Sequence, residues 1–447
     1  HGTDSICEWK KRMQSLEKDR CHLDRIGSGR TRDLQDDQDN GKRFSNVLEG
    51  QRHCIDQIDI HKGAEHTSAH KCNRVDTLYF QKQQISYAHN KSLDQSDHDK
   101  EHPTSEISSC RSKTGNGFVF VYFLFQDVLR NGMASKYYSC FYQLPAKPKL
   151  PAPGELPEYT CFSYVASMPK TNTADPYLRQ YFCDVGTYWI QEFDIDGWRL
   201  DVANELDDGF LRAFRTAVKA AKPDAVIVGE VWENAAHYLN GDMMDSAMNY
   251  DFRRYCRRFF AEETVDAETF DTNVSTLLLR YRENALFAQL NLLDSHDVSR
   301  YLSLCGENTD KMELSVLLQM TFPGMPCVFY GDEKGLCGLS ESEYRQAMAW
   351  GNAHPLEDIY RRLIALRKEH PALRYGDFVT NFAAGKTYSY SRNWENTRIT
   401  VTMNLGGAPI PAPQTGRLLL KKGGNHDIIG AWEYEVREER IHGGDDL

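Results

Sequence analysis

The pattern of apolar and polar positions changes near residue 115. Residues 1–115 show neither strand alternation nor the three-to-four spacing of an amphipathic helix, and their apolar runs are about as short as "LYF" (78–80). Nine of the fifteen histidines and five of the twelve cysteines fall in this segment. Such a segment buries too little apolar surface to form a core. We leave residues 1–115 unassigned, as disordered or non-native to the protein.

Helical and strand patterns alternate after this point. Apolar positions at helical spacing predict helices over 174–193 and 207–222, the first with Pro176 in its opening turn. Apolar strand patterns follow each of them, in residues 194–202 and 226–232. This alternation predicts βα units with parallel strands.

Acidic residues recur at the ends of the predicted strands. Asp201, Glu230, Asp297 and Asp332 each end an apolar run, and the gaps of 29, 67 and 35 residues fit one, two and one βα units of about 30 residues. In a (β/α)8 barrel, the C-terminal ends of the strands carry the active site. The predicted fold class is therefore α/β, a TIM barrel with its carboxylates at one mouth.

The end of the chain has a different pattern. Residues 358–373 predict the last barrel helix, and the alternation that begins with "TYSYSRNWENTRITVTMNL" is typical of strands. We therefore predict a small C-terminal antiparallel β domain over 374–447. The last dozen residues resemble a frayed tail.

Composition narrows the choice of partners. The formal net charge of −11 argues against nucleic acid or an anionic membrane as a partner, and no apolar stretch approaches the ~20 residues of a membrane span. The cysteines follow no regular interval, which favours reduced thiols in a cytoplasmic protein. Without a paired C-x-x-C motif, we predict no metal and no cofactor.

Carboxylates at one barrel mouth suit glycoside hydrolysis, which needs one ionised carboxylate and one carboxylic acid. Arg199 lies two residues before Asp201 on the same strand, so it faces the same side and would keep that carboxylate ionised. Glu230 precedes Val231 and Trp232, and an apolar setting raises the pKa of a glutamate.

Each residue also has a purely structural interpretation. Arg199 and Asp201 could form a buried structural ion pair, Glu230 could be a solvated acid at a strand end, and His296 could be a core histidine. These interpretations weaken because all of the residues fall at strand ends in one barrel register.

Four motifs together resemble the α-amylase superfamily. They are "GWRLDVANE" (197–205), "GEVW" (229–232), "LLDSHDVSR" (292–300) and "MPKTN" (168–172). The "MPK-x-N" element and the Ala-Asn-Glu after the nucleophile position are similar to the cyclomaltodextrinase, neopullulanase and maltogenic amylase branch. The resemblance extends from about residue 117 to about residue 405.

The resemblance implies a role for each matching residue. Asp201 would be the nucleophile, Glu230 the general acid/base and Asp297 the transition-state stabiliser. Arg199 would orient the nucleophile and His296 would contact the sugar at the cleavage point, both as substrate-binding residues. Asn204, Glu205 and Trp232 would lie on the acceptor side. The implied reaction is retaining hydrolysis of α-1,4-glucosidic bonds in cyclodextrins, maltodextrins or pullulan-like glucans, with some transglycosylation. Some relatives bind calcium, but no matching acidic loop is present here, and the oligomeric state cannot be predicted.

One motif of the family is missing. A third-strand "D-x-x-x-N-H" element should lie where the chain has "ISSCRSKTGNG" (107–117). We therefore predict a barrel domain over 116–373, with strands 4–8 recognisable, an irregular insertion at about 126–172, and an incomplete N-terminal side. The alternative function is a catalytically impaired amylase-like protein; a transglycosylase or sugar isomerase of the same superfamily is a third possibility.

Overall fold

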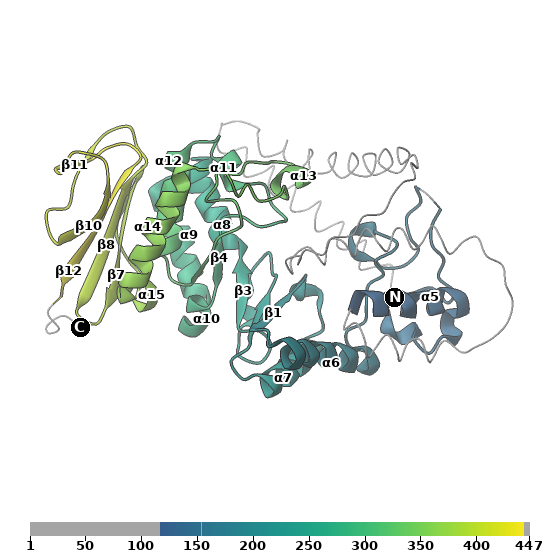
Figure 1. Ribbon diagram of the computed structural model, residues 1–447. Helices are drawn as coiled ribbons and strands as arrows, with labels where there is room; N and C mark the ends of the chain where they lie inside the picture. The colour runs from purple at the N-terminus through teal and green to yellow at the C-terminus, as the bar shows by residue number, and fades with distance from the viewer. Residues whose placement is uncertain (1–116, 153, 442–447) are drawn as a thin grey trace, which may run out of the picture. The chain divides into compact units, whose positions relative to one another are not determined.

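The computed structural model describes residues 117–152 and 154–441 (Figure 1). The chain divides into two units, residues 1–100 and 101–447, and every described residue belongs to the second. The prediction for residues 1–115 therefore lies outside the described residues, as does the predicted absence of the first barrel strands.

A parallel sheet organises the first part of the described chain. Its strands are adjacent in sequence order, as they are in a barrel wall, and the first pair is parallel with Gly197 opposite Val226. The strands are β1 (Gly197–Leu200), β2 (Val226–Gly229), β3 (Ser246–Asn249), β4 (Leu290–Leu292) and β5 (Met325–Cys327). The strands predicted before Asp201, Glu230, Asp297 and Asp332 are confirmed as β1, β2, β4 and β5.

Helices connect these strands. They are α5 (Gly117–Asn131), α6 (Pro176–Phe193), α7 (Asp208–Ala221), α8 (Tyr250–Cys256), α9 (Ala267–Arg280), α10 (Glu283–Phe287), α11 (Tyr301–Leu304), α12 (Thr309–Thr321), α13 (Glu341–Tyr344), α14 (Pro355–Glu369) and α15 (Pro371–Tyr375). Single helical turns are η1 (Gly132–Ala134), η2 (Tyr138–Cys140), η3 (Phe162–Tyr164), η4 (Ala203–Glu205) and η5 (Ala236–Tyr238), and η6 (Arg257–Ala261) is a π-helix.

The ends of α6 show why the predicted helix forms. The Asp175 carboxylate accepts hydrogen bonds from the backbone N–H groups of Tyr177 and Leu178, and Pro176 occupies the first turn. The helix ends at Asp194, whose φ of 49° is the left-handed C-cap conformation.

The predicted last barrel helix is two helices. His370 has φ −112° and ψ 103°, so α14 ends before it and α15 begins at Pro371. A proline disfavours helical backbone in the residue before it, and it has no N–H to continue the hydrogen-bond ladder. The single helix predicted over 358–373 was therefore wrong at its C-terminal end.

The C-terminal part forms an antiparallel sheet with the order β10-β12-β8-β7-β6. Its strands are β6 (Val379–Ala384), β7 (Thr387–Trp394), β8 (Thr397–Asn404), β10 (Arg417–Lys422) and β12 (Glu433–Arg440); β9 (Ile410–Pro411) and β11 (Ile428–Ile429) make a separate small pair. The predicted C-terminal antiparallel sheet is confirmed. The frayed tail was wrong for residues 436–440, which belong to β12.

One apolar core extends from the helices into this sheet. It includes Phe259 and Phe270, then Phe322 at the end of α12, and Tyr388 and Tyr390 on the inner face of β7. Figure 1 shows α14 and α15 beside the C-terminal sheet, and both contribute core residues. The sheet is thus packed against the helices through shared side chains.

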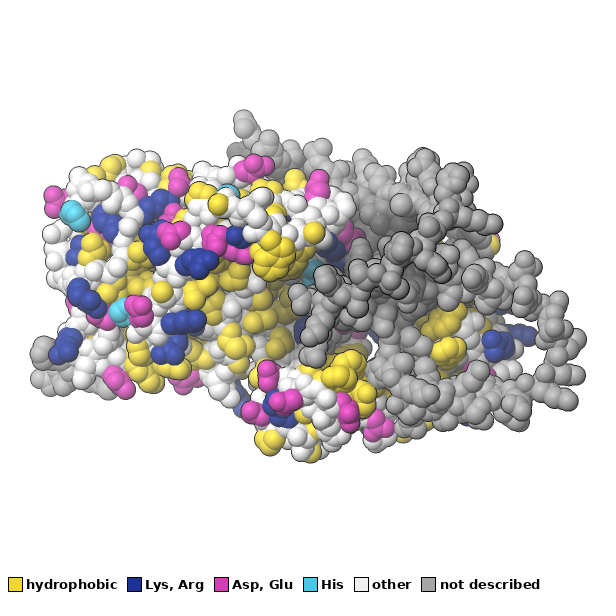
Figure 2. Space-filling model, viewed as in Figure 1, with side chains coloured by type: hydrophobic (Ala, Val, Ile, Leu, Met, Phe, Trp, Pro, Cys, Tyr) yellow, Lys and Arg dark blue, Asp and Glu magenta, His cyan; other side chains and the backbone are white. Residues whose placement is uncertain are grey.

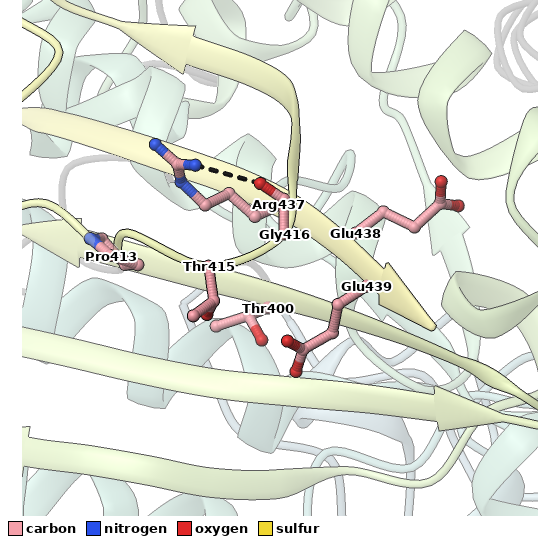
Figure 3. A pocket seen from close by; sticks show the side chains of 7 residues that line it. All are labelled: Thr400, Pro413, Thr415, Gly416, Arg437, Glu438 and Glu439. Atoms are coloured by element: carbon pink, nitrogen blue, oxygen red, sulfur yellow. Dashed lines mark hydrogen bonds between the residues drawn. The ribbon is translucent and has the colours of Figure 1, made fainter. Parts of the chain in front are cut away.

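The surface of the described residues has two notable features, a mixture of charges and one small hollow. Acidic and basic side chains are interspersed on the face of the described residues seen in Figure 2. A small hollow lies on the C-terminal sheet among Thr400, Thr415, Arg437 and Glu439, where Arg437 Nη1 donates to Gly416 O at 3.1 Å (Figure 3). Within the described part of the chain, no helix is both long and apolar enough to cross a bilayer.

Candidate active site

The ends of β1 and β2 bring Arg199, Asp201 and Glu230 together. Glu230 N donates to Leu200 O at 2.8 Å, so the two strand ends are level. One guanidinium then contacts both carboxylates: Arg199 Nη1 pairs with Asp201 Oδ1, and Nη2 lies 3.0 Å from Glu230 Oε1. The side chain of Asp201 is 75% exposed and that of Glu230 only 4%. The two acids therefore differ sharply in environment while sharing one cation.

Glu230 is held by donors on both of its oxygens. Val202 N donates to Oε2 at 2.9 Å, and Trp232 Nε1 donates to Oε1 at 3.2 Å. A Cβ at the preceding residue, Gly229, would lie 2.2 Å from the sulfur of Met244, so a larger residue there would displace the methionine side chain. Backbone and indole thus fix the carboxylate.

His296 and Asp297 follow β4 and meet an arginine from a later segment. His296 Nε2 lies 2.9 Å from Asp297 Oδ2, and Arg345 Nη2 lies 2.8 Å from Oδ1. Arg345 Nε also donates to His296 O at 2.7 Å. The hydrogen bond from His296 is the largest cause that lowers the pKa of Asp297, and the positive charges of Arg345 and Arg199 lower it further against the opposing effect of burial. Asp297 is therefore held as a carboxylate.

Tyr250 lies between the two groups. Its ring stacks on the indole of Trp232 with centroids 4.1 Å apart and planes at 8°. Its hydroxyl is 3.3 Å from Ser295 Oγ, which in turn accepts the N–H of Asp297 at 3.2 Å. Burial is the largest cause that raises the pKa of Tyr250 to about 12, and the charges of Glu230 and Asp297 add to it. The tyrosine stays neutral beside both acids.

The predicted acceptor-side residues lie on η4 and at the end of β2. Asn204 is exposed, and its carbonyl accepts a hydrogen bond from Tyr238 at 3.2 Å. Glu205 pairs with Lys170 Nζ at 2.9 Å, which links the "MPKTN" segment to the strand that carries Asp201. Trp232 is 45% exposed beside Glu230. The indole of Trp232 thus contacts Glu230, and Asn204 and Glu205 lie on the turn that follows Asp201.

Three contributing residues were not predicted. Arg345 and Tyr250 belong to no motif that sequence reasoning could use, whereas Lys170 lay in a quoted motif without a role. The fourth strand-end acid, Asp332, is 3% exposed and pairs with the buried Arg300 instead of with Arg199 or Arg345. Within the described residues, no group of three or more acidic, histidine or cysteine side chains is arranged to hold a metal ion.

The geometry defines the chemistry that is available. A buried acid and an exposed carboxylate share one arginine, and a third carboxylate with a lowered pKa is electrostatically coupled to the same arginine. These groups are suited to acid-assisted displacement at a glycosidic carbon, and the third carboxylate provides negative charge opposite an oxocarbenium-like transition state. Parallel βα units with these acids at their strand ends are typical of TIM-barrel glycosidases.

Comparison with known proteins gives the family. Residues 154–354 match the alpha amylase catalytic domain. The structure is similar to that of a debranching enzyme from Nostoc punctiforme, with a TM-score of 0.65 and 31% identity, over 70% of this chain and 72% of the other. The chain belongs to the α-amylase family, and its fold is the TIM barrel with a C-terminal antiparallel sheet.

Curated relatives point to one branch of that family. The chain is 42% identical to a cyclomaltodextrinase of Thermoanaerobacter pseudethanolicus over 63% of this chain and 50% of the relative. It is 38% identical to neopullulanase 2 of Thermoactinomyces vulgaris over 72% of this chain and 54% of the relative. The chain thus spans about half the length of the curated relatives it matches.

Proposed function

We propose that the protein is a retaining glycoside hydrolase that cleaves α-1,4-glucosidic bonds of cyclodextrins, maltodextrins or pullulan-like α-glucans. The observation that carries the proposal is the bridge from Arg199 to both Asp201 and Glu230. One guanidinium that contacts both acids holds them close together, and a retaining mechanism needs its nucleophile and its acid/base close to one anomeric centre. The names of the relatives supply the substrate class.

Each acid has a task in this mechanism. Asp201, exposed and paired with Arg199, attacks the anomeric carbon and forms a covalent glycosyl-enzyme. Glu230, buried and oriented by Val202 and Trp232, gives a proton to the leaving oxygen and then removes one from water. Asp297, ionised between His296 and Arg345, stabilises the oxocarbenium-like transition state.

Acceptor choice belongs to Asn204, Glu205 and Trp232 in this proposal. The glycosyl-enzyme can pass its sugar to water or to another sugar, so hydrolysis and transglycosylation share one intermediate. An open indole beside Glu230 can stack on a sugar ring, and the Lys170–Glu205 pair presents polar atoms next to it.

The test is incubation of the purified chain with β-cyclodextrin, pullulan and starch, followed by product analysis and NMR of the first anomer released. Turnover with the α-anomer first is expected. Asp201→Asn should lower kcat by roughly 10⁴-fold or more, whereas Asp358→Asn, at an exposed helical site, should leave it unchanged. A folded chain that turns over none of the three substrates would overturn the proposal in favour of an impaired, amylase-like binding protein.

We also infer a cytoplasmic location. All seven cysteines in the described part of the chain are free thiols, and several of them are buried. Cell fractionation tests this inference, and recovery of the protein outside the cytoplasm would contradict it.

A further inference from the structure

A second pair of acids lies buried behind the candidate stabiliser. Asp294 follows β4 and Asp332 follows β5, and they are 2% and 3% exposed. Their carboxyl groups are in hydrogen-bonding contact with each other. Asp332 Oδ1 also lies 2.9 Å from Nη1 of Arg300, an arginine that is completely buried. The proposed mechanism makes no use of these groups.

A hydrogen bond between two carboxyl groups requires a proton. Asp294 Oδ1 is buried and has no hydrogen-bond donor among the described residues. The neighbouring Asp332 carboxyl group can supply a donor only when one of the two acids carries a proton. Burial raises the pKa of both groups, and for Asp332 the neighbouring carboxyl raises it further. Two acids sharing a dry site cannot both ionise cheaply, so one proton stays between them.

The same pair closes the loop that carries His296 and Asp297. Asp294 Oδ2 accepts the N–H of Tyr301 at 2.8 Å, across the base of the loop. Arg253 spans the same base, with Nε 2.7 Å from Leu293 O and Nη2 2.9 Å from Ser299 O. Asp294 Oδ2 thus holds the loop, and the carboxyl group of the same residue contacts Asp332.

Ionisation of the second carboxyl would place two negative charges at this base. The charge of Arg253 opposes the raised pKa of Asp294, as that of Arg300 does for both acids, but each arginine is also bound to backbone carbonyls. The titratable and charged groups around the pair are Arg253 on α8, Arg300 and Tyr301 at α11, Cys305, Cys327 at the end of β5, Glu333, Cys337 and Tyr360 on α14.

We propose that Asp294 and Asp332 share one proton and serve as positioning residues, holding the loop of residues 293–301 so that Asp297 faces the substrate. This rests on the proposed function for the role of Asp297. Loss of the shared proton at alkaline pH then sets the upper pH limit of activity.

The raised pKa values of Asp294 and Asp332 determine how the stability of the folded protein changes with pH. The stabilisation is complete below the ordinary carboxyl pKa of about 3.9 and is lost as pH rises through the raised value of the folded protein. Within that window, one shared proton changes the unfolding equilibrium constant by about tenfold per pH unit. The wild-type protein should therefore lose stability toward alkaline pH.

Asp294→Asn tests the proposal, because its amide can donate to Asp332 in place of the shared proton. The unfolding equilibrium constant, measured in urea across pH 5–9, should depend less steeply on pH in the variant, by up to about tenfold per pH unit. At the pH optimum, kcat/KM should stay within about twofold of wild type, and the variant should keep a larger share of its kcat at pH 9. Asp358→Asn, which removes an exposed acid, should leave both profiles unchanged.

Superimposable profiles for wild type and Asp294→Asn would overturn the proposal. Asp332→Asn is the second variant, and an unchanged slope in it would overturn the proposal equally if Asp294→Asn does not fold. The unfolding measurement needs no substrate. A chain without turnover that still shows the altered slope would therefore overturn the proposed function and the positioning role, while supporting the shared proton.

Discussion

At the scale of single residues, Arg345 joins two parts of the candidate site. It lies 48 positions after Asp297 and contacts both that carboxylate and the carbonyl of His296. Asp201, Glu230 and Asp297 could be predicted because each follows an apolar strand at a barrel-like interval. Arg345 could not, because its segment has no periodicity and its partner is defined only by the folded chain.

We expect Arg345→Leu to lower kcat/KM by roughly 10- to 100-fold, because Asp297 loses a positioning contact. The pKa of Asp297 should rise, so the acid limb of the pH profile should move toward neutral pH. Asp297 also contributes stability above its unfolded pKa that is lost as pH falls through the lowered folded pKa, and the variant should lose that contribution. Steady-state kinetics over pH 4–8 is the measurement.

Arg361→Leu is the matched control, since its exposed side chain pairs only with Glu357 within α14. An unshifted acid limb in Arg345→Leu, with wild-type kcat/KM, would show that the arginine does not act on Asp297.

At the scale of elements, α9 shows how one aromatic side chain joins helix to sheet. Phe270 is fully buried; its ring stacks on Phe259 at 4.4 Å and meets Tyr388 of β7 edge-on at 5.2 Å. The helix thereby connects the π-helical turn after α8 to the C-terminal sheet.

Phe270→Ala should reduce the free energy of unfolding by about 3–5 kcal/mol, because it removes buried apolar surface and leaves a cavity. Leu279→Ala on the same helix, where the side chain is 87% exposed, should change it by less than about 0.5 kcal/mol. Urea unfolding monitored by circular dichroism measures both. Equal effects of the two substitutions would contradict this packing.

Elements with local signals were predictable. The capping aspartate and the first-turn proline of α6 are visible in the sequence, and so is the alternation of β7 and β8. The break before Pro371 was missed because the apolar spacing runs on across it. Residues 436–440 of β12 were predicted as tail because the strand carries many charges. Its Glu435 is fully buried yet paired with Lys421 and Arg437, an arrangement that an apolar pattern does not reveal.

At the scale of the whole described region, barrel helices and C-terminal sheet share one core. The Thr321 hydroxyl bonds to that of Tyr390, and Tyr434 on β12 donates to Glu313 on α12 at 2.9 Å. The strand spacing predicted the barrel and the later alternation predicted the sheet. Their common core was beyond prediction, because it is made of contacts between segments some 70 to 120 residues apart.

We expect Phe322→Ala, on the helical side of this core, to destabilise the sheet as well. Hydrogen–deuterium exchange should speed up in β7 and β8 to the same degree as in α12, because one cooperative unit opens together. Val379→Ala, at an exposed position of the edge strand β6, is the control and should leave α12 unchanged. Exchange that rises in α12 alone would mean that the sheet is an independent unit.

The backbone of Val202 has a consequence for how this protein can be improved. Its φ of 45° is a left-handed conformation that costs a β-branched residue about 1–3 kcal/mol, and that conformation directs its N–H to Glu230. Glycine would adopt this conformation without strain and would keep the N–H. Val202→Gly should therefore raise the melting temperature, with part of the gain offset by the higher conformational entropy of the unfolded chain. A selection for thermostability should therefore find a substitution next to Asp201, where the gain in stability is set against the rigidity with which Val202 holds the Glu230 carboxyl group.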